Sequence, residues 1–134
     1  MTMRTTGTTY VEFNLLLVDR DETLSLAGSM GISRVEAAGY IGLLVAFGLK
    51  YADDDGQVDI FSDKAIEDGC AWDGQRGELL KAFMLSGVLV GERDSSSNPI
   101  HVAPDLWAAL AGKSIKARAD ARRRKQNQRL RAEK

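Results

Sequence analysis

The segment from residues 34 to 50 constrains the fold most, because its apolar residues fall on nearly every face of a helix. Ser33 followed by Glu36 is a capping-box pattern, which predicts that a helix starts here. The apolar residues that follow are Val35, Ala38, Ile41, Leu44, Val45 and Phe47. A helix that is apolar nearly all round lies in the centre of a core. We therefore expect the rest of the chain to pack around this helix.

The stretch after this helix predicts three short elements. Residues 53–56, three aspartates and a glycine, are typical of a turn. Residues 58–61, with Val58, Ile60 and Phe61, then indicate a very short strand. Ser62 can cap a helix of one to two turns over 63–68, which the following glycine closes.

A further helix and a hairpin are predicted next. Asp73 can cap a helix over about 74–86 whose apolar stripe is Leu79, Leu80, Phe83 and Met84. Gly87 has the character of a C-terminal glycine stop. Residues 88–90 and 100–102 are apolar runs on either side of a polar turn, which indicates a β-hairpin.

The N-terminal part predicts a strand followed by a short helix. Residues 8–18 begin with alternating apolar and polar side chains, which is a strand pattern. Asp19 and Glu22 have the spacing of a helix N-terminal cap. We expect this helix to end near Ala27, because glycines follow it.

The order of these elements predicts the fold class. Helix, short strand, helix, turn, helix and hairpin is the order of a winged helix-turn-helix, within a chain that is α+β and mainly helical. In that fold, the helix over 74–86 is the recognition helix and the hairpin is the wing. A last short helix starts at Asp105 and ends at Gly112. We therefore divide the chain into a winged-helix domain over 1–112, with an N-terminal strand-helix extension, and a basic, helix-prone tail over 113–134.

The charges of the chain are split between its two parts. The net charge is −1, but residues 113–134 hold ten basic and two acidic residues, a net +8, which leaves −9 for residues 1–112. Such a split indicates a basic arm that binds phosphate. Its predicted nucleic-acid contacts are Lys113, Lys116, Arg118, Arg122, Arg123, Arg124, Lys125, Arg129 and Arg131. The alternatives are an arm that folds back on its own acidic body, and one that improves solubility or binds a partner.

Several short stretches occur in an order that points to a known family. They are residues 31–39 (GISRVEAAG), 51–56 (YADDDG), 71–74 (AWDG), 79–83 (LLKAF), 86–89 (SGVL), Ile100-His101, Trp107, Gly112 and the basic tail. In this order they resemble the N-terminal winged-helix domains of phage replisome organisers and DnaD-like replication initiators. The resemblance implies DNA binding, oligomerisation and contact with replication proteins such as a helicase or its loader, in the cytoplasm of a bacterial host cell.

The predicted recognition helix offers three side chains for base contacts. Gln75, Arg76 and Lys81 are accompanied by Asp73 and Glu78, so the net charge of this helix is zero. Arginine and glutamine can read guanine and adenine edges. A face that is merely solvated is the other interpretation.

The sequence offers no catalytic set, and we expect no enzyme activity, cofactor or metal. Cys70 is the single cysteine and has no partner for an internal disulfide. His101 lacks a second metal ligand, and Trp72 and Trp107 are expected in the core. If Gly56 is aligned with the glycine of an EF-hand loop, the residue at the first ligand position is not a calcium ligand. This excludes a calcium site of that type. No apolar run reaches the length of a membrane span, and the N-terminus does not have the pattern of a secretory signal, so we expect no membrane partner.

Two functions from different classes follow. The first is a DNA-binding protein of phage or prophage replication, in which the tail contacts phosphates and the helix over 74–86 supplies any specificity. The second is a winged-helix adaptor that docks other proteins through its acidic body.

Overall fold

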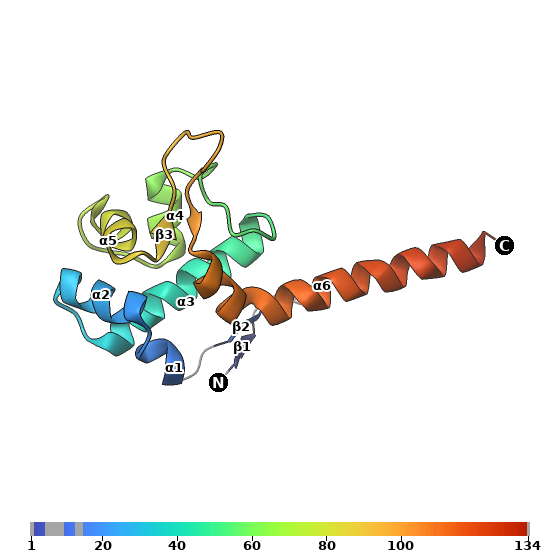
Figure 1. The fold of residues 1–134 in the computed structure, drawn as a ribbon, viewed down its shortest axis with the longest axis horizontal. Coiled ribbons are helices and arrows are strands. Elements are labelled where there is room, and N and C mark those ends of the chain that lie inside the picture. The colour runs from blue at the N-terminus through green and yellow to red at the C-terminus, as the bar shows by residue number, and fades with distance from the viewer. Residues whose placement is uncertain (1, 5–9, 13–14, 134) are drawn as a thin grey trace.

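A computed structural model describes residues 2–4, 10–12 and 15–133 of the chain. The described part is mainly helical, with two small antiparallel two-stranded sheets (Figure 1). In chain order the elements are β1 (Thr2–Arg4), β2 (Tyr10–Glu12), α1 (Leu15–Val18), α2 (Asp21–Met30), α3 (Arg34–Tyr51), α4 (Asp63–Gly69), α5 (Glu78–Ser86), β3 (Leu89–Val90), β4 (His101–Val102) and α6 (Pro104–Ala132). The mainly helical α+β class is therefore confirmed.

Helix α3 lies at the centre of the core, as its sequence predicts. The hydroxyl of Ser33 accepts a hydrogen bond from the backbone amide of Glu36 at 3.1 Å, so the predicted cap is confirmed. Helices α1, α2, α4 and α6 all contact α3. Its fully buried apolar residues include Ala37, Ala38, Ile41, Leu44 and Val45. The two ends of the helix are less covered: Val35 in the first turn is 66% exposed, and Tyr51, the last residue, is 55% exposed.

Helix α5 packs its predicted stripe into the core but starts later than expected. Leu79 and Phe83 are fully buried, and Gly87 ends the helix with a positive φ of 80°. The helix begins at Glu78 rather than near residue 74, so that predicted start is wrong. Gly77 has a φ of 90°, a left-handed conformation that glycine adopts at little cost. This break holds the preceding residues in a turn.

The hairpin after α5 is confirmed, and it is joined to the segment that follows α3. Strands β3 and β4 pair with Val90 opposite His101, while Gln57 forms an isolated bridge to His101. The amide of Val58 donates to the carbonyl of Ile100 at 3.0 Å. The predicted strand over 58–61 is otherwise wrong, because the chain turns away there and Ile60 is 83% exposed.

The N-terminal prediction is correct only in part. Of residues 8–18, the described positions 10–12 form β2, but α1 is helical where a strand was expected, and the remaining positions of that prediction lie outside the described residues. Leu17 of α1 is buried, and its carbonyl accepts a hydrogen bond from the Thr23 hydroxyl at 2.6 Å. Helix α2 starts at Asp21 without a side-chain cap, so the expected cap at Asp19 is wrong.

Helix α6 begins in the core and then leaves it. Leu106, Trp107 and Leu110 are buried, and the ring nitrogen of Trp107 donates to the carbonyl of Asp54 at 2.7 Å. The expected end at Gly112 is wrong, since one helix of 29 residues runs through it. The residues around this glycine are good helix formers, which offset its intrinsic cost of about 1 kcal/mol. The second half of α6 projects from the body as a single straight helix (Figure 1).

Among the described residues, no single helix is both long and apolar enough to cross a membrane. Helices α2 and α3 reach that length and hydropathy only as a pair, and the chain bends by 112° between them.

Candidate nucleic-acid interface

The root of the projecting helix, which is the part of α6 that carries Arg118 and Arg122, is held to the acidic body by hydrogen bonds and ion pairs. Nη2 of Arg118 donates to the carbonyl of Leu49 at 2.6 Å, near the C-terminal end of α3. Asp54 lies beside the same helix, with Oδ1 4.0 Å from Nη1 of Arg118 and Oδ2 3.3 Å from Nη2 of Arg122. For these two arginines, therefore, the structure agrees with the predicted alternative in which the arm pairs with its own acidic body.

Beyond this root, most of the cations on α6 lack an internal partner. Arg123 pairs with Asp120 on the same helix at 3.0 Å. Four further cations are exposed and make no ion pair with any described residue: Arg124, Lys125, Arg129 and Arg131. Lys113 and Lys116 are also exposed but lie closer to the body. The distal part of α6 thus presents positive charge that no carboxylate of the described chain neutralises.

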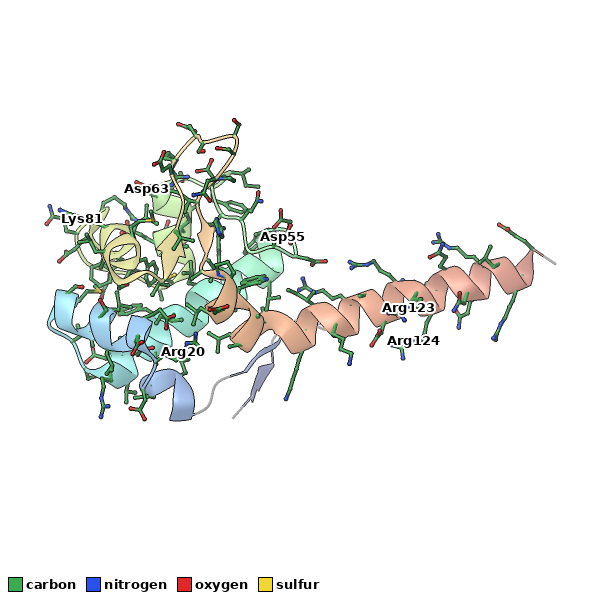
Figure 2. The ribbon with its side chains drawn as sticks, viewed as in Figure 1. Arg20, Asp55, Asp63, Lys81, Arg123 and Arg124 are labelled. Atoms are coloured by element: carbon green, nitrogen blue, oxygen red, sulfur yellow. The ribbon has the colours of Figure 1, made fainter. Side chains whose placement is uncertain are left out.

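Part of this charge is concentrated on one side of the helix. Arg122, Lys125, Gln126 and Arg129 together line a shallow hollow of about 380 Å³. Residues three and four positions apart face the same side of an α-helix, which explains why these side chains meet. Figure 2 shows the side chains of α6 projecting to both sides of the helix, among them Arg123 and Arg124.

The three predicted base-contacting residues come together at the start of α5. Gln75, Arg76 and Lys81 line one open hollow of about 460 Å³ with Gly77 and Glu78. Only Lys81 of the three lies on the helix itself, because α5 begins at Glu78. Gln75 and Arg76 therefore belong to the preceding turn and not to the predicted recognition helix.

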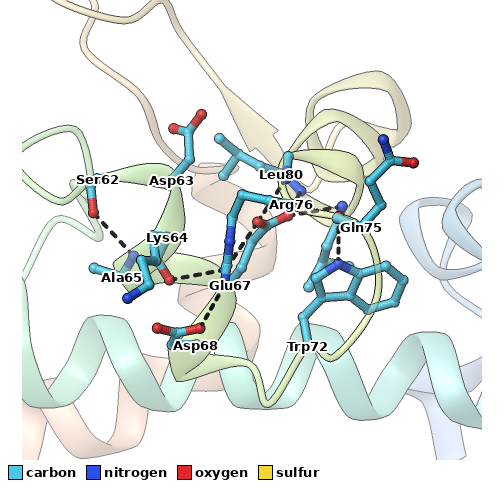
Figure 3. A network of polar contacts seen from close by, with 12 residues as sticks. Ser62, Asp63, Lys64, Ala65, Glu67, Asp68, Trp72, Gln75, Arg76 and Leu80 are labelled. Atoms are coloured by element: carbon cyan, nitrogen blue, oxygen red, sulfur yellow. Dashed lines mark hydrogen bonds and ion pairs between the residues drawn. The ribbon is translucent and has the colours of Figure 1, made fainter.

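The N-terminus of α5 is occupied by a carboxylate of the chain itself (Figure 3). Glu67 is fully buried, and its two oxygens accept hydrogen bonds from the backbone amides of Gly77 at 2.8 Å, Leu79 at 3.1 Å and Leu80 at 3.3 Å. These amides are the free donors that would otherwise attract a phosphate. This helix end is thus already satisfied.

Glu67 was missed by the sequence analysis because its signal is weak. It stands next to Asp68 in a short helix, and two adjacent acidic residues look like a solvated face. Its side chain holds Arg76, with Nη1 3.3 Å from Oε1, while Nη2 of Arg76 lies 3.3 Å from Asp68. The turn before α5 is therefore ordered by an acidic clamp on the preceding helix.

Arg93, the arginine of the hairpin, is also bound by other residues of the body. Nη1 of Arg93 donates to the carbonyls of Asp59 at 2.7 Å and Phe61 at 3.0 Å, and Nη2 pairs with Asp63. These contacts tie the hairpin to the segment before α4. Arg93 is consequently an anchor of the hairpin rather than a side chain extended into solvent.

Every arginine between residues 15 and 112 is paired with a carboxylate of the body. Arg20 pairs with Glu22 at 3.2 Å and Arg34 pairs with Asp19 at 2.8 Å, in addition to the pairs of Arg76 and Arg93. Residues 15–112 carry more carboxylates than cations. After the arginines are paired, the remaining carboxylates leave the surface of the described body acidic. The exposed cations without an ion pair in this part of the described chain are Lys50, Lys64 and Lys81, whereas α6 brings four such cations within eight positions, from Arg124 to Arg131.

The remaining polar residues of interest are structural. The Trp72 ring nitrogen donates to the carbonyl of Gln75 at 2.9 Å, and Nδ1 of His101 hydrogen bonds the carbonyl of Pro99 at 2.7 Å. Cys70 is buried, and burial, with a smaller contribution from the charge of Glu67, raises the pKa of its thiol to about 12. Within the described ranges, no group of three histidine, cysteine or acidic residues is placed to hold a metal ion.

Comparisons with models of protein families, with curated proteins and with solved structures give no match to this chain. Its function is therefore inferred from its own geometry. In that geometry, the contrast between the paired arginines of the body and the unpaired cations of α6 is the strongest feature.

Proposed function

We propose that this chain is a DNA-binding protein in which α6 contacts phosphates and the body is a winged helix-turn-helix. One observation carries the proposal: the arginines of the body between residues 15 and 112 are paired with body carboxylates, whereas Arg124, Lys125, Arg129 and Arg131 pair with no described residue. Clustered cations without fixed partners bind phosphates and supply affinity rather than sequence preference.

The winged-helix assignment is supported by how the elements connect. Helices α3, α4 and α5 precede the β3–β4 hairpin, which is the expected order of three helices and a wing. The bridge from Gln57 to His101 adds the short segment after α3 to the hairpin, in the place of the first strand of that fold. In this assignment α5 occupies the position of the recognition helix, and Lys81 is its exposed cation.

The electrostatics of α6 favour a polyanionic ligand. Adjacent cations from Arg122 to Lys125 repel one another, and this repulsion opposes the helix until counter-charge is bound. Binding to DNA replaces condensed counterions on the phosphates with these side chains, which is entropically favourable. The resemblance of the sequence to replisome organisers supports a role in replication initiation of a phage or prophage, in a bacterial cytoplasm, with a helicase or its loader as partner.

The test is the salt dependence of DNA binding. We expect a quadruple variant, Arg124→Gln, Lys125→Gln, Arg129→Gln and Arg131→Gln, to bind DNA more weakly for all sequences. Its slope of log affinity against log salt should be shallower by about 3–4, because each lost duplex phosphate contact removes roughly 0.9 from the slope. The control is Lys50→Gln with Lys64→Gln, which removes two exposed cations of the body and should leave the slope unchanged. An unchanged slope in the quadruple variant would rule out α6 as the DNA anchor.

The pairing of the body arginines also favours a second function. A body whose arginines are neutralised presents an acidic surface, which suits the docking of a basic protein partner. In this alternative the winged helix is an adaptor, and α6 is auxiliary. The two functions separate at low salt: if the intact protein binds no DNA there, the adaptor function is the better proposal.

A further inference from the structure

The unpaired cations of α6 form two rows, with a narrow edge of two alanines and one glutamine between them. An α-helix turns by about 100° per residue, so Lys125 and Arg129 share one face. Arg124 and Arg131 share a second face, about 130° around the axis from the first. The edge between the rows consists of Ala121, Gln128 and Ala132.

This arrangement has the dimensions of a groove-binding helix. An α-helix with its side chains is about 10–12 Å wide, and the major groove of B-form DNA is about 12 Å wide. Alanines on the inserted edge allow the helix backbone to come close to the bases. Cations on both flanks then meet the phosphates of the two strands that border the groove.

We propose that α6 enters the major groove of duplex DNA with this edge inward, and that Gln128 reads adenine there. The proposal rests on the proposed function and names its substrate class. A glutamine amide can bond N6 and N7 of adenine in a bidentate manner. Gln126 lies on a different edge, where it lines a hollow with Arg122, Lys125 and Arg129. The other flank of that edge is Arg123, which is held by Asp120. Unpaired cations therefore flank the edge of Gln128 on both sides, but that of Gln126 on one side only.

Two other nucleic-acid classes fit this helix less well. Single strands are held by stacking of bases on aromatic side chains, and residues 113–134 contain no aromatic residue. Duplex RNA has a deep, narrow major groove that side chains do not read. B-form duplex DNA is the class whose groove matches both the width and the two flanks of α6.

The position of the edge also places the DNA relative to the body. Gln128 continues the side of α6 on which Leu110 and Ser114 are buried nearer the N-terminus of the helix. Arg122, which Asp54 contacts, lies about 120° around the helix from Gln128, so the acidic turn flanks this edge and does not line it (Figure 2 labels Asp55, next to Asp54). The body that buries Leu110 and Ser114 then limits how far along α6 the duplex can approach.

The first experiment compares three nucleic acids with the intact protein. Fluorescence anisotropy uses a 20-base-pair DNA duplex, one of its strands alone, and an RNA duplex of the same sequence. We expect the DNA duplex to bind at least about tenfold tighter than either other ligand, and to be protected from methylation at guanine N7, which lies in the major groove. Equal binding of the single strand or the RNA, or no N7 protection, would overturn the groove assignment. No binding of any of the three at low salt would instead remove the proposed function.

The second experiment tests the two rows and the edge. Lys125→Gln with Arg129→Gln and Arg124→Gln with Arg131→Gln remove equal charge from the two flanks, and each pair should make the salt slope shallower by about 2. A pair without effect would mean that α6 lies on the outside of one strand, which contradicts insertion.

The base contact is tested by a matched pair of alanine variants. Gln128→Ala should reduce the preference between DNA sequences by at least about fivefold, whereas Gln126→Ala should leave it unchanged. Both residues are exposed on the same helix, so loss of folding affects neither selectively. The reverse result, or an unchanged preference in both, would overturn the role of Gln128.

Discussion

Asp54 and Arg122, 68 positions apart in the chain, form an ion pair in which Oδ2 lies 3.3 Å from Nη2. Both side chains are exposed, at 40% and 64%, so the pair contributes at most about 1 kcal/mol to stability. Its position matters more than its strength. It is where the acidic body and the basic helix meet, and it places a carboxylate beside the proposed phosphate-binding surface.

The first prediction concerns this carboxylate. Asp54→Asn should strengthen DNA binding at low salt by up to about fivefold, because an exposed ion pair worth up to about 1 kcal/mol no longer competes for Arg122. Anisotropy titrations of a DNA duplex measure the change. Glu92→Gln in the hairpin loop removes the same charge from an exposed position and is the control. An equal gain in the control would show that overall charge, rather than this pair, is responsible.

The second prediction concerns Glu67. Glu67→Gln should destabilise the protein by about 3–5 kcal/mol, because an amide nitrogen replaces one oxygen that faces backbone amides and Arg76 loses its buried partner. Asp68→Asn removes the exposed partner of the same arginine and should cost less than about 1 kcal/mol. Urea denaturation of both variants gives the comparison. Similar midpoints for the two would show that Glu67 does not order α5.

Much of the fold can be predicted because the signals are local. The cap at Ser33, the cap at Ser62 and the glycine stop at Gly87 each depend on a few neighbouring residues, and the structure has all three. The hairpin follows from two apolar runs around a polar turn. Local chemistry is decisive wherever a backbone amide or carbonyl at a helix end needs one nearby partner.

The predicted helix boundaries are wrong where contacts between residues distant in the sequence determine where a helix begins or ends. The start of α5 depends on Glu67, which lies 10 positions before Gly77 and accepts a hydrogen bond from its amide. The continuation of α6 through Gly112 depends on strong helix formers after it and on the contact of Arg118 with Leu49. The candidate site, too, can be predicted only in part, because its ion pairs join residues that are distant in the sequence. The cationic tail is visible in the sequence, but the internal pairing of Arg76 and Arg93 is not.

The third prediction concerns pH. The pKa of Cys70 is raised by burial from its usual 9.0 to about 12 in the folded protein. Between these values the unfolded chain has lost the thiol proton and the folded chain keeps it, so raising the pH favours unfolding. Relative to Cys70→Ala, the free energy of unfolding of the wild type should fall between pH 9 and 12, by at most about 1.4 kcal/mol per pH unit. Parallel pH profiles for the two proteins would contradict the burial of this thiol.

The fourth prediction concerns where the chain can be shortened. A chain of residues 1–121 should melt cooperatively, with a Tm near that of the full chain, because the part removed is exposed helix. A chain of residues 1–112 should be about 2–4 kcal/mol less stable, since it also lacks the half-buried Ile115 and the hydrogen bond of Arg118 to Leu49. Calorimetry of the two chains is the measurement. Equal Tm values would place the boundary at Gly112 after all, and loss of cooperativity in the longer chain would make the distal helix part of the fold.

The last prediction separates the two roles open to Arg76. Its guanidinium lies 3.3 Å from both Glu67 and Asp68, so reading a guanine would require it to leave two carboxylates. Arg76→Ala should therefore lower the free energy of unfolding by about 1–3 kcal/mol, since Glu67 then loses a charged partner. The variant should keep the wild-type ranking of DNA sequences and the wild-type salt slope. Lys81→Ala, in the same hollow and without an ion pair to any described residue, is the control and should leave stability unchanged. Unaltered stability of Arg76→Ala together with a changed ranking of sequences would instead identify Arg76 as a base contact, and α5 as the specificity element.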